Sequence, residues 1–365
     1  MTQVFENLRE KLDVYSVGFP ATESGVELKL LKKLFTEEDA KLFLDLSLSL
    51  ENSDSIAEKT GRNVQETENH LDKLAKKGLI FKQKTDSQVL YGAFPFVAGW
   101  YEYPLFNADK ELAGLVEAYF EEGFLSDQAK NSILPKRSEP VRENDENALR
   151  IAPYMDAVDI IKSKEIIALA DCVCRSHKKI LEENCDKPIE TCFVFDSHAE
   201  FYVENGMGRF ISQDEALEIL DKCDYAGLVH QTGNTVNPGG MCNCCGDCCR
   251  ILRMLKKSEN PSKLVLNKYH LKIDQEECIS CETCKDQCQM DAIKPGPDGL
   301  ATVDQNRCIG CGQCAYFCPA KAVTMELKSE GDLQIPSQND TSITDEIESY
   351  RGMNHFHSSI FVKSV

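Results

Sequence analysis

The stretch that decides the class of this chain reads CISCETCKDQC over residues 278–288, and CIGCGQCAYFCP follows over residues 308–319. Both use the spacing C-x-x-C-x-x-C-x-x-x-C, at Cys278, Cys281, Cys284 and Cys288 and again at Cys308, Cys311, Cys314 and Cys318. Three thiols in one short loop can hold one face of an inorganic core while the fourth reaches a second core. Two zinc sites of four thiolates each would leave the repeated spacing and Pro319 unexplained. An iron–sulfur domain is therefore predicted here.

The two motifs resemble the bacterial-type ferredoxin domain that holds two [4Fe–4S] clusters. The resemblance covers roughly Lys272 to Leu327, and it implies that each cluster takes three cysteines from one repeat and the fourth from the other. The implied ligands are Cys278, Cys281, Cys284 and Cys318 for the first cluster and Cys308, Cys311, Cys314 and Cys288 for the second. The first repeat departs from the family pattern at Gln289, where the family has proline.

The charge of the chain limits its partners. Forty-one lysines and arginines stand against 60 aspartates and glutamates, which gives a net charge of −19. Such a chain repels phosphate backbones and anionic lipid, so nucleic acid is disfavoured as the main partner. No apolar run reaches the roughly 18 residues that suggest a membrane span. The N-terminal residues MTQVFENLREKLD do not read as a secretory signal, so the cytoplasm is the expected compartment.

The cysteines divide the chain into two halves. All 18 lie between Cys172 and Cys318. Because a cytosolic compartment keeps thiols reduced, metal binding is a better explanation for them than disulfides. With the length of 365 residues, which predicts two or three domains at about 150 residues each, they indicate an α+β multidomain protein. The expected parts are a winged-helix-like helical domain (1–130, core 25–92), a linker (131–150), a small cysteine-rich α/β domain (151–260), a dicluster ferredoxin fold (270–327) and a polar tail (328–365).

The cysteine-free half carries a helix, turn, helix and hairpin pattern. The segment IAEKTGRNVQETENHLDKLAKKGLI, residues 56–80, resembles the MarR-like and ArsR-like winged-helix families, in which the second helix enters the major groove. In this chain that helix carries Glu66, Glu68 and Asp72 at its exposed positions. Acidic side chains oppose a DNA backbone, so a structural or protein-docking use of the winged helix is favoured over DNA binding.

The middle region alternates short apolar runs with helical patterns. Strands are expected in EIIALADC, TCFVFD and LVHQTG, and a helix is expected after the Ser212-x-x-Glu215 capping box. A first group of thiols could hold a third cluster, namely Cys172, Cys174, Cys185 and Cys192. The alternatives are a zinc site, with His177 as a substitute ligand, or buried thiols without a ligand role.

A second and denser group of thiols follows in MCNCCGDCC. It comprises Cys242, Cys244, Cys245, Cys248 and Cys249, with Cys223 upstream. These are more thiols than one cubane uses. One cysteine of each adjacent pair could therefore bind a cluster while its neighbour packs or serves another site, and the two groups could also share ligands. Spacing alone leaves these arrangements open. Gly239, Gly240 and Gly246 would let the backbone wrap closely around an inorganic core.

The whole chain resembles iron–sulfur proteins of anaerobic bacteria and archaea that carry a winged helix in front and a ferredoxin domain behind. The motifs are GFPATESGVELKLL, CVCR, CDKPIETCFVF and CNCCGDCC. The resemblance implies redox work with several clusters and supplies no substrate. Besides the two ferredoxin clusters, one or two further iron–sulfur clusters are expected in the middle domain.

Three functions remain. An electron-transfer protein that serves a redox donor or acceptor protein is favoured, and a homo- or hetero-oligomer stays open. The second is a reductase with an open-site cluster in the middle domain, for which Arg175, His177, His198 and Glu200 are the acid–base candidates. The third is a redox-responsive regulator that reads DNA. Neither a G-x-G-x-x-G nor a G-x-x-x-x-G-K-[ST] motif supports a nucleotide. The tail contains His355 and His357, which make a poor metal site.

Overall fold

The computed structural model describes residues 2–15, 18–85, 87–96, 101–103, 108–124, 136–139, 157–183, 185–233, 235 and 237–329. The chain divides into two compact units. The first contains residues 1–132, 176–184 and 339–365, and the second contains residues 133–175 and 185–338. No helix among the described residues is long and apolar enough to cross a membrane.

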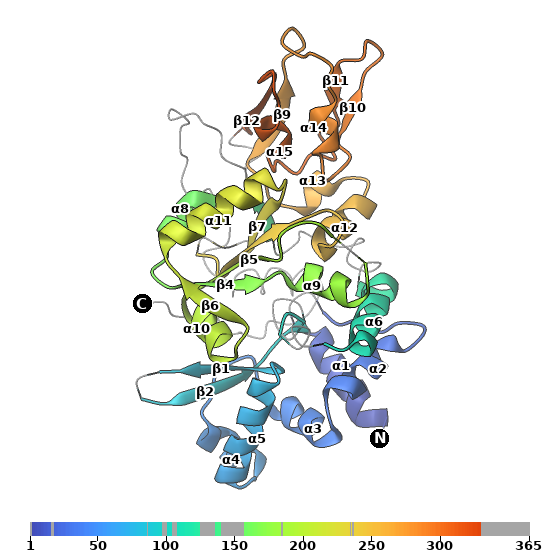
Figure 1. Ribbon diagram of the computed structural model, residues 1–365. Helices are drawn as coiled ribbons and strands as arrows, with labels where there is room; N and C mark the ends of the chain where they lie inside the picture. The colour runs from blue at the N-terminus through green and yellow to red at the C-terminus, as the bar shows by residue number, and fades with distance from the viewer. Residues whose placement is uncertain are drawn as a thin grey trace. The chain divides into compact units, whose positions relative to one another are not determined.

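The first unit is mainly helical (Figure 1). Its helices are α1 (Thr2–Asp13), α2 (Val26–Leu34), α3 (Glu37–Asp45), α4 (Ser53–Thr60), α5 (Val64–Lys76) and α6 (Lys110–Tyr119), and a π-helical turn follows at Phe120–Phe124. Strands β1 (Ile80–Lys84) and β2 (Val89–Ala93) form an antiparallel hairpin. The predicted order of helix, turn, helix and hairpin is therefore present between Ser53 and Ala93. Membership of a winged-helix family remains a prediction.

The acidic character predicted for α5 is present at its surface. Glu66 and Asp72 are exposed. Asp72 accepts hydrogen bonds from Lys82 Nζ (2.6 Å) and from the Tyr91 hydroxyl (2.7 Å), which connect α5 to the hairpin. In this helix the acids therefore support the local fold.

A six-stranded sheet forms the centre of the second unit. Its order is β3-β7-β8-β5-β4-β6, and all its pairings are antiparallel. The strands are β3 (Lys136–Glu139), β4 (Ile167–Asp171), β5 (Glu190–Phe195), β6 (Gly208–Ile211), β7 (Val229–Gly233) and β8 (Gly240–Cys244). Helices α8 (Ala157–Lys162) and α11 (Gln213–Tyr225) bury an apolar core on one face, and α10 (Asp196–Glu204) packs on the other. Helices α12 (Arg250–Lys257) and α13 (Pro261–Leu264) complete this part, and helix α9 (Val173–Ile180) begins in it and continues in the first unit from Ser176.

The C-terminal part of the same unit has an internal repeat (Figure 1). Strand β9 (Tyr269–Ile273) pairs with β12 (Val323–Leu327), and β10 (Ile293–Pro295) pairs with β11 (Ala301–Val303), both antiparallel. Short helices α14 (Thr283–Asp286) and α15 (Gln313–Tyr316) each contain the third cysteine of one repeat. The apolar core of this part includes Leu271, Ile293 and Val323.

The observed elements differ from the expected organisation in three places. Residues 136–139, inside the segment predicted as a linker, form edge strand β3 and pair with β7. Residues 176–184, predicted in the cysteine-rich domain, belong to the first unit. The cysteine-rich and ferredoxin-like parts, predicted as separate domains, fall within one unit. The predicted strands in the middle region are confirmed as β4, β5 and β7, and Ser212 caps α11 as expected. Of the predicted tail, residues 330–365, with His355 and His357, lie outside the described residues.

Candidate metal centres

Two cavities in the C-terminal part are each lined by four cysteines. The first cavity, of about 470 Å³, is lined by Cys278, Cys281, Cys284 and Cys318. Burial raises the pKa of Cys284, and the negative charges of the other three thiols raise it further. Three of these thiols come from the first repeat and one from the second, as the resemblance to ferredoxins implies.

The second cavity has the complementary set. It measures about 360 Å³ and is lined by Cys288, Cys308, Cys311 and Cys314. Burial raises the pKa of Cys311 to about 12, and the charges of Cys288 and Cys308 act in the same direction. Burial raises the pKa of Cys308 and Cys314 as well, so without a cation these three thiols would stay protonated. A metal core that replaces their protons is therefore what this donor set suits.

The backbone repeats its shape at the two sites. Ser280 and Glu282 have φ values of 55° and 57°, and Gly310 and Gly312, at the equivalent positions, have 67° and 77°. This left-handed conformation costs a non-glycine residue roughly 1–2 kcal/mol. At Gly310 a Cβ would also lie 2.9 Å from the Tyr269 carbonyl oxygen, so glycine is required there for space as well. The first repeat keeps the costly shape because both loops must wrap the same kind of core.

The comparison with protein families agrees with this geometry. Residues 271–325 match the family model described as a 4Fe-4S dicluster domain. The C-terminal part is ferredoxin-like. This supports iron–sulfur clusters as its cofactors, as predicted. No curated protein and no solved structure matches the chain.

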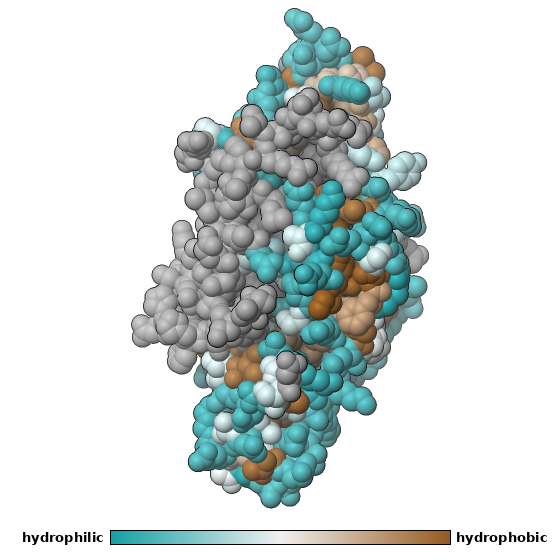
Figure 2. Space-filling view, turned by 90° about the vertical axis from the view of Figure 1, so that its left-hand side faces the viewer, coloured by the Kyte–Doolittle hydropathy of each residue, from teal (hydrophilic) through white to brown (hydrophobic). Residues whose placement is uncertain are grey.

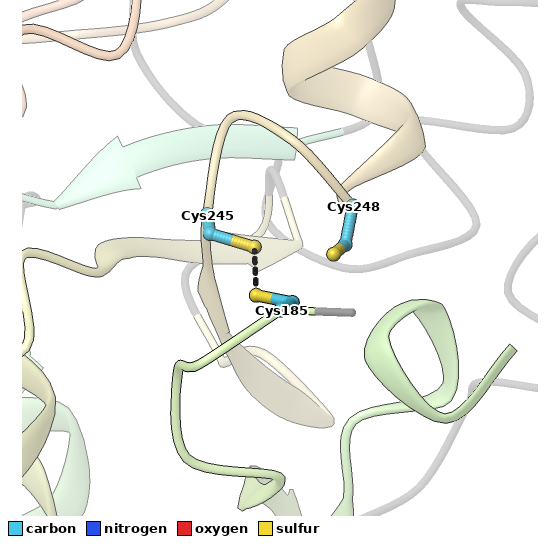
Figure 3. Close-up of side chains that lie close together, drawn as sticks. All are labelled: Cys185, Cys245 and Cys248. Carbon is cyan, nitrogen blue, oxygen red and sulfur yellow. Dashed lines mark hydrogen bonds between the residues drawn. The ribbon is translucent and has the colours of Figure 1, made fainter. Parts of the chain in front are cut away.

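The cysteines of the middle region lie in two separate groups. The first, here called the three-thiol site, consists of Cys185, Cys245 and Cys248, whose sulfur atoms all lie within 4.8 Å of one another. The Sγ atoms of Cys185 and Cys245 are 3.8 Å apart (Figure 3). The hydrogen bond from Cys248 lowers the pKa of Cys245 to about 5, helped by the positive charge of Arg175.

The second group, here called the thiol ring, is larger. It consists of six thiols, and each of them shifts the pKa of two neighbours, in the order Cys172, Cys174, Cys249, Cys244, Cys242, Cys192 and back to Cys172. The thiols of Cys172 and Cys249 lower the pKa of Cys174 well below its ordinary value. The thiols of Cys172 and Cys242 raise the pKa of Cys192.

The alternation of a β-strand explains why adjacent cysteines separate. Successive side chains of a strand point to opposite faces of a sheet. On β8, Cys242 and Cys244 therefore share one face, and Met241, on the other, packs in the same core as Cys245. Beyond the strand, Cys248 belongs to the three-thiol site and Cys249 to the thiol ring. Of the first predicted group, Cys172, Cys174 and Cys192 therefore lie in the thiol ring and Cys185 lies in the three-thiol site. Each site contains thiols of both predicted groups, and the two sites stay separate. The ligand assignments themselves remain predictions.

Two helix ends contribute to the thiol ring. Cys174 lies in the first turn of α9, and Cys249 is the residue before the first turn of α12. The N-terminus of a helix carries a partial positive charge, which stabilises a thiolate. The peptide N–H of Cys172 donates to the Ile189 carbonyl oxygen at 2.7 Å and so fixes the start of the CVCR motif.

Arg175 is the functional residue whose role sequence reasoning missed. Its side chain is buried, 2% exposed, and its guanidinium donates to the carbonyl oxygen of Asn243 (3.0 Å), to the Thr191 hydroxyl and toward Cys245 Sγ (3.9 Å). Although burial alone would lower its pKa, the nearby thiolates, with that of Cys172 first, raise it. Arginine does not deprotonate in proteins, so Arg175 cannot serve as an acid–base group and acts as a buried positive charge. The position of Arg175 directly after the C-x-C motif could have indicated a positive charge beside the thiols.

A chain of buried polar groups holds the carbonyl that Arg175 contacts. Asn243 donates from its amide to the Thr191 carbonyl oxygen at 2.6 Å and contacts His230 Nδ1 at 2.5 Å. The other ring nitrogen of His230 lies 2.5 Å from Asp224. These bonds connect β5, β7, β8 and α11 behind the cysteines, and they therefore fix the strand from which Cys242 and Cys244 project.

The remaining candidates lie apart from the thiols or carry no ligand role. His177 Nε2 lies 3.4 Å from Glu117 Oε2, within the first unit. Burial lowers the pKa of His198 to about 4, so it is neutral at pH 7. Glu200 is exposed. Cys223, on α11, is fully buried in the apolar core, where burial raises its pKa to about 12. It belongs to neither thiol group.

Proposed function

We propose that this chain is an iron–sulfur electron-transfer protein. Its two [4Fe–4S] clusters are held by Cys278, Cys281, Cys284 and Cys318 and by Cys308, Cys311, Cys314 and Cys288. The observation that carries the proposal is the pair of cavities, each lined by three cysteines of one repeat and one of the other. A cluster with four thiolate ligands is saturated, so it exchanges single electrons and leaves no iron for substrate.

The first cluster site is the end at which a soluble partner would exchange electrons. Cys281 is exposed and the neighbouring Ile279 is 63% exposed, whereas the equivalent residues of the second site are half-buried Cys311 and Ile309, which is 1% exposed. Glu276 and Glu277 stand exposed beside the first site. Hydrophilic residues also cover most of the described surface in Figure 2. An acidic surface around an exposed cluster favours a redox partner with a basic docking face.

The second cluster site faces inward, toward the cysteine-rich part. Gln289, which follows ligand Cys288, accepts a hydrogen bond from the Gly246 N–H (2.8 Å), and Gly246 follows Cys245 of the three-thiol site. Gln313, fully buried beside Cys314, donates to the Leu228 carbonyl oxygen at 2.6 Å. The departure from proline at position 289 thus has a physical reason, because the glutamine amide connects the two parts. These contacts give electrons a short bonded path into the middle region.

The first experiment is a count of iron and acid-labile sulfide in the anaerobically purified chain and in a Cys311→Ser variant. The proposal expects at least about eight irons and eight sulfides in the wild type, with about four of each lost in the variant. The matched control is Cys223→Ser, since that cysteine is buried but lies in neither cavity. Reversible reduction, followed by electron paramagnetic resonance, should persist in the control. A wild type without acid-labile sulfide would contradict the proposal.

A reductase is the second candidate, favoured by one observation. The three-thiol site offers three ligands among the described residues, and three-ligand metal sites are the kind that keep a position for a small substrate. A redox role there requires iron. Iron lost specifically from a Cys185→Ser variant would support the reductase, and zinc lost in its place would count against it.

A further inference from the structure

We propose that the cysteine-rich part holds two different metal centres. The thiol ring binds one polynuclear iron–sulfur centre through six thiolates, and the three-thiol site binds a single tetrahedral zinc ion. The proposal deepens the proposed function and rests on it in one respect, the use of iron–sulfur chemistry by this chain. It replaces the expectation of a further four-thiolate cubane in this region.

The spacing of the three-thiol site suits a single ion. A Zn–S bond of about 2.3 Å places two thiolates of a tetrahedral ion about 3.8 Å apart. The Sγ atoms of Cys185 and Cys245 are 3.8 Å apart, and the Sγ atom of Cys248 lies within 4.8 Å of both. A site without inorganic sulfide takes the metal that binds its thiolates most strongly, and zinc binds more strongly than ferrous iron.

The ferredoxin-like part of the same chain provides an internal comparison. In a cubane each iron carries one protein thiolate, so the four sulfurs stand on different metal atoms. Among all described cysteines, the three-thiol site is the one group of three or more whose sulfur atoms lie mutually within 4.8 Å. The thiols around the two ferredoxin cavities are more widely spaced. The three-thiol site therefore does not have the geometry that this chain uses for a cubane.

The thiol ring has neither the geometry of a single-ion site nor that of a cubane site. Each of its thiols has two others as its main electrostatic neighbours, yet no three of the six lie mutually within 4.8 Å. One ion would draw at least three of them together, and one cubane would use four and leave two idle. A closed ring of six suits a core of several metal atoms in which neighbouring thiolates share or border the same ion.

Charge explains why these thiols are ligands instead of simple buried side chains. Arg175 is buried, and a buried cation requires an anion nearby. Among the described residues no carboxylate bonds to Arg175, whose guanidinium reaches only neutral groups and the sulfur of Cys245, 3.9 Å away, with the thiols of Cys172 and Cys192 nearby. Thiols become thiolates in such a setting when a metal ion replaces their protons. Arg175 then offsets part of the negative charge of both centres.

The test measures iron, zinc and acid-labile sulfide in the anaerobically purified full chain and in substituted chains. The ring variants are six single Cys→Ser substitutions, one at each ring position. The second probe is the double variant Cys185→Ser with Cys248→Ser, and Cys223→Ser is the control. Each ring variant should lose the same amount of iron and sulfide and keep its zinc. The double variant should lose about one zinc per chain and no sulfide.

Several results would overturn the proposal. Two ring variants that match the control would mean a four-thiolate cubane with two spare cysteines. Iron and sulfide lost from the double variant would mean one merged site. A wild type with only about eight irons and no zinc would mean no centre in this region, while the ferredoxin clusters, read separately from Cys311→Ser, would still stand.

Zinc X-ray absorption of the wild type tests the smaller centre without any substitution. Three sulfur ligands at about 2.3 Å would support it, and a shell of nitrogen or oxygen alone would exclude it. Retention of the ferredoxin irons in every variant shows that the chain has folded.

Discussion

The two compact units each bury a charged side chain, and they balance it in different ways. In the first unit Asp39, whose side chain is 1% exposed, accepts hydrogen bonds from Lys77 Nζ (2.7 Å) and the Thr36 N–H (3.1 Å) and contacts His70 Nε2 at 2.8 Å. In the second unit Arg175 contacts neutral groups and thiols. The charge of the Asp39 carboxylate is balanced by side chains of the chain itself, and no metal is needed. A guanidinium among thiols is balanced only when those thiols are ionised.

This difference indicates that different interactions stabilise the two units. Packing and ordinary ion pairs stabilise the first unit, since its core residues and the partners of Asp39 all belong to the chain. With the proposed metal centres, the second unit would depend on metal, because ligand thiols shed their protons upon binding and the binding free energy becomes folding free energy. Each prediction below tests this division, in order of decreasing effect.

Metal removal should have the largest effect. Stripping the anaerobic protein with a chelator should accelerate hydrogen exchange at the amides of β4, β5, β7 and β8 by on the order of a hundredfold or more. The amides of α3 and α5 should exchange as before, and they serve as the internal control. Equal acceleration in both units would break the comparison, because it would show that the first unit also depends on metal.

Replacing Arg175 by methionine should come next. Removing one partner of a buried charged set costs about 3–5 kcal/mol, because the thiolates would remain without their counter-charge. The Arg175→Met variant should therefore lose metal from the cysteine-rich part while the ferredoxin clusters remain, as measured by iron, zinc and sulfide content. The control is Arg209→Met, whose side chain is 48% exposed beside Glu190 and Glu215. Exposed ion pairs contribute about 1 kcal/mol or less. Unchanged metal content in Arg175→Met would remove the charge argument.

The Asp39→Asn variant tests the other side of the comparison. Burial alone would raise the pKa of Asp39, but hydrogen bonds from Lys77 and His70 outweigh it and hold the pKa well below its usual range. A carboxylate with a depressed pKa stabilises the fold above the unfolded value of about 4 and loses that contribution as pH falls below it. The variant should destabilise α3 and α5 at neutral pH by about 3 kcal/mol. Hydrogen exchange between pH 7 and pH 3 should show wild type and variant converging toward acid.

The exposed Asp72 provides the matched control for that experiment. It also bonds to a lysine, Lys82, but its side chain is 48% exposed. An Asp72→Asn variant should change stability far less, as exposed ion pairs do. If the metal content of Asp39→Asn also fell, the two units would not be independent in the way proposed.

Sequence-based prediction is most successful where the residues of a site lie close together in the chain. The ferredoxin repeats are such a case, because the four cysteines of each repeat stand at a fixed spacing within eleven residues, and each cavity contains one of the two predicted sets. The strands β4, β5 and β7 were equally readable from their apolar runs. The antiparallel order of the sheet was not, because pairing joins strands that are distant in sequence.

The cysteine-rich part could not be predicted in this way, because its sites combine residues that are distant in the sequence. Cys185 approaches Cys245 across sixty residues of sequence, and the neighbours Cys244 and Cys245 separate because β8 ends at Cys244 and the chain turns there. That Cys242 and Cys244 would lie in a strand was hidden by cysteine and glycine, which carry little strand signal. The edge strand β3 was missed for a similar reason, as its residues KRSE read as polar linker. When strand pairing brings together residues that are distant in sequence, the site can be predicted only once the pairing of the strands is known.

The smallest effect on stability is expected from substitutions at the Gln289–Gly246 hydrogen bond, which connects the ferredoxin-like and cysteine-rich parts without a metal ligand. Gln289 accepts from the Gly246 N–H and also donates to the Gly227 carbonyl oxygen at 3.4 Å. A Gln289→Ala variant should lose about 1 kcal/mol, the value of an ordinary hydrogen bond. In Gly246→Ala a Cβ would lie 2.5 Å from Gln289 Oε1, so the same contact would open from the other side.

The double variant separates this contact from a general loss of packing. If Gly246 and Gln289 act through one bond, the combined substitution should cost no more than the larger single one, because a shared interaction is lost only once. Hydrogen exchange at Leu228 and around Gly246 would measure the opening, with iron and sulfide unchanged throughout. Additive costs would mean two independent contacts. Lost iron would mean that the glutamine supports the Cys288 cluster itself, and the connection between the two parts would then be metal-dependent like the rest of the unit.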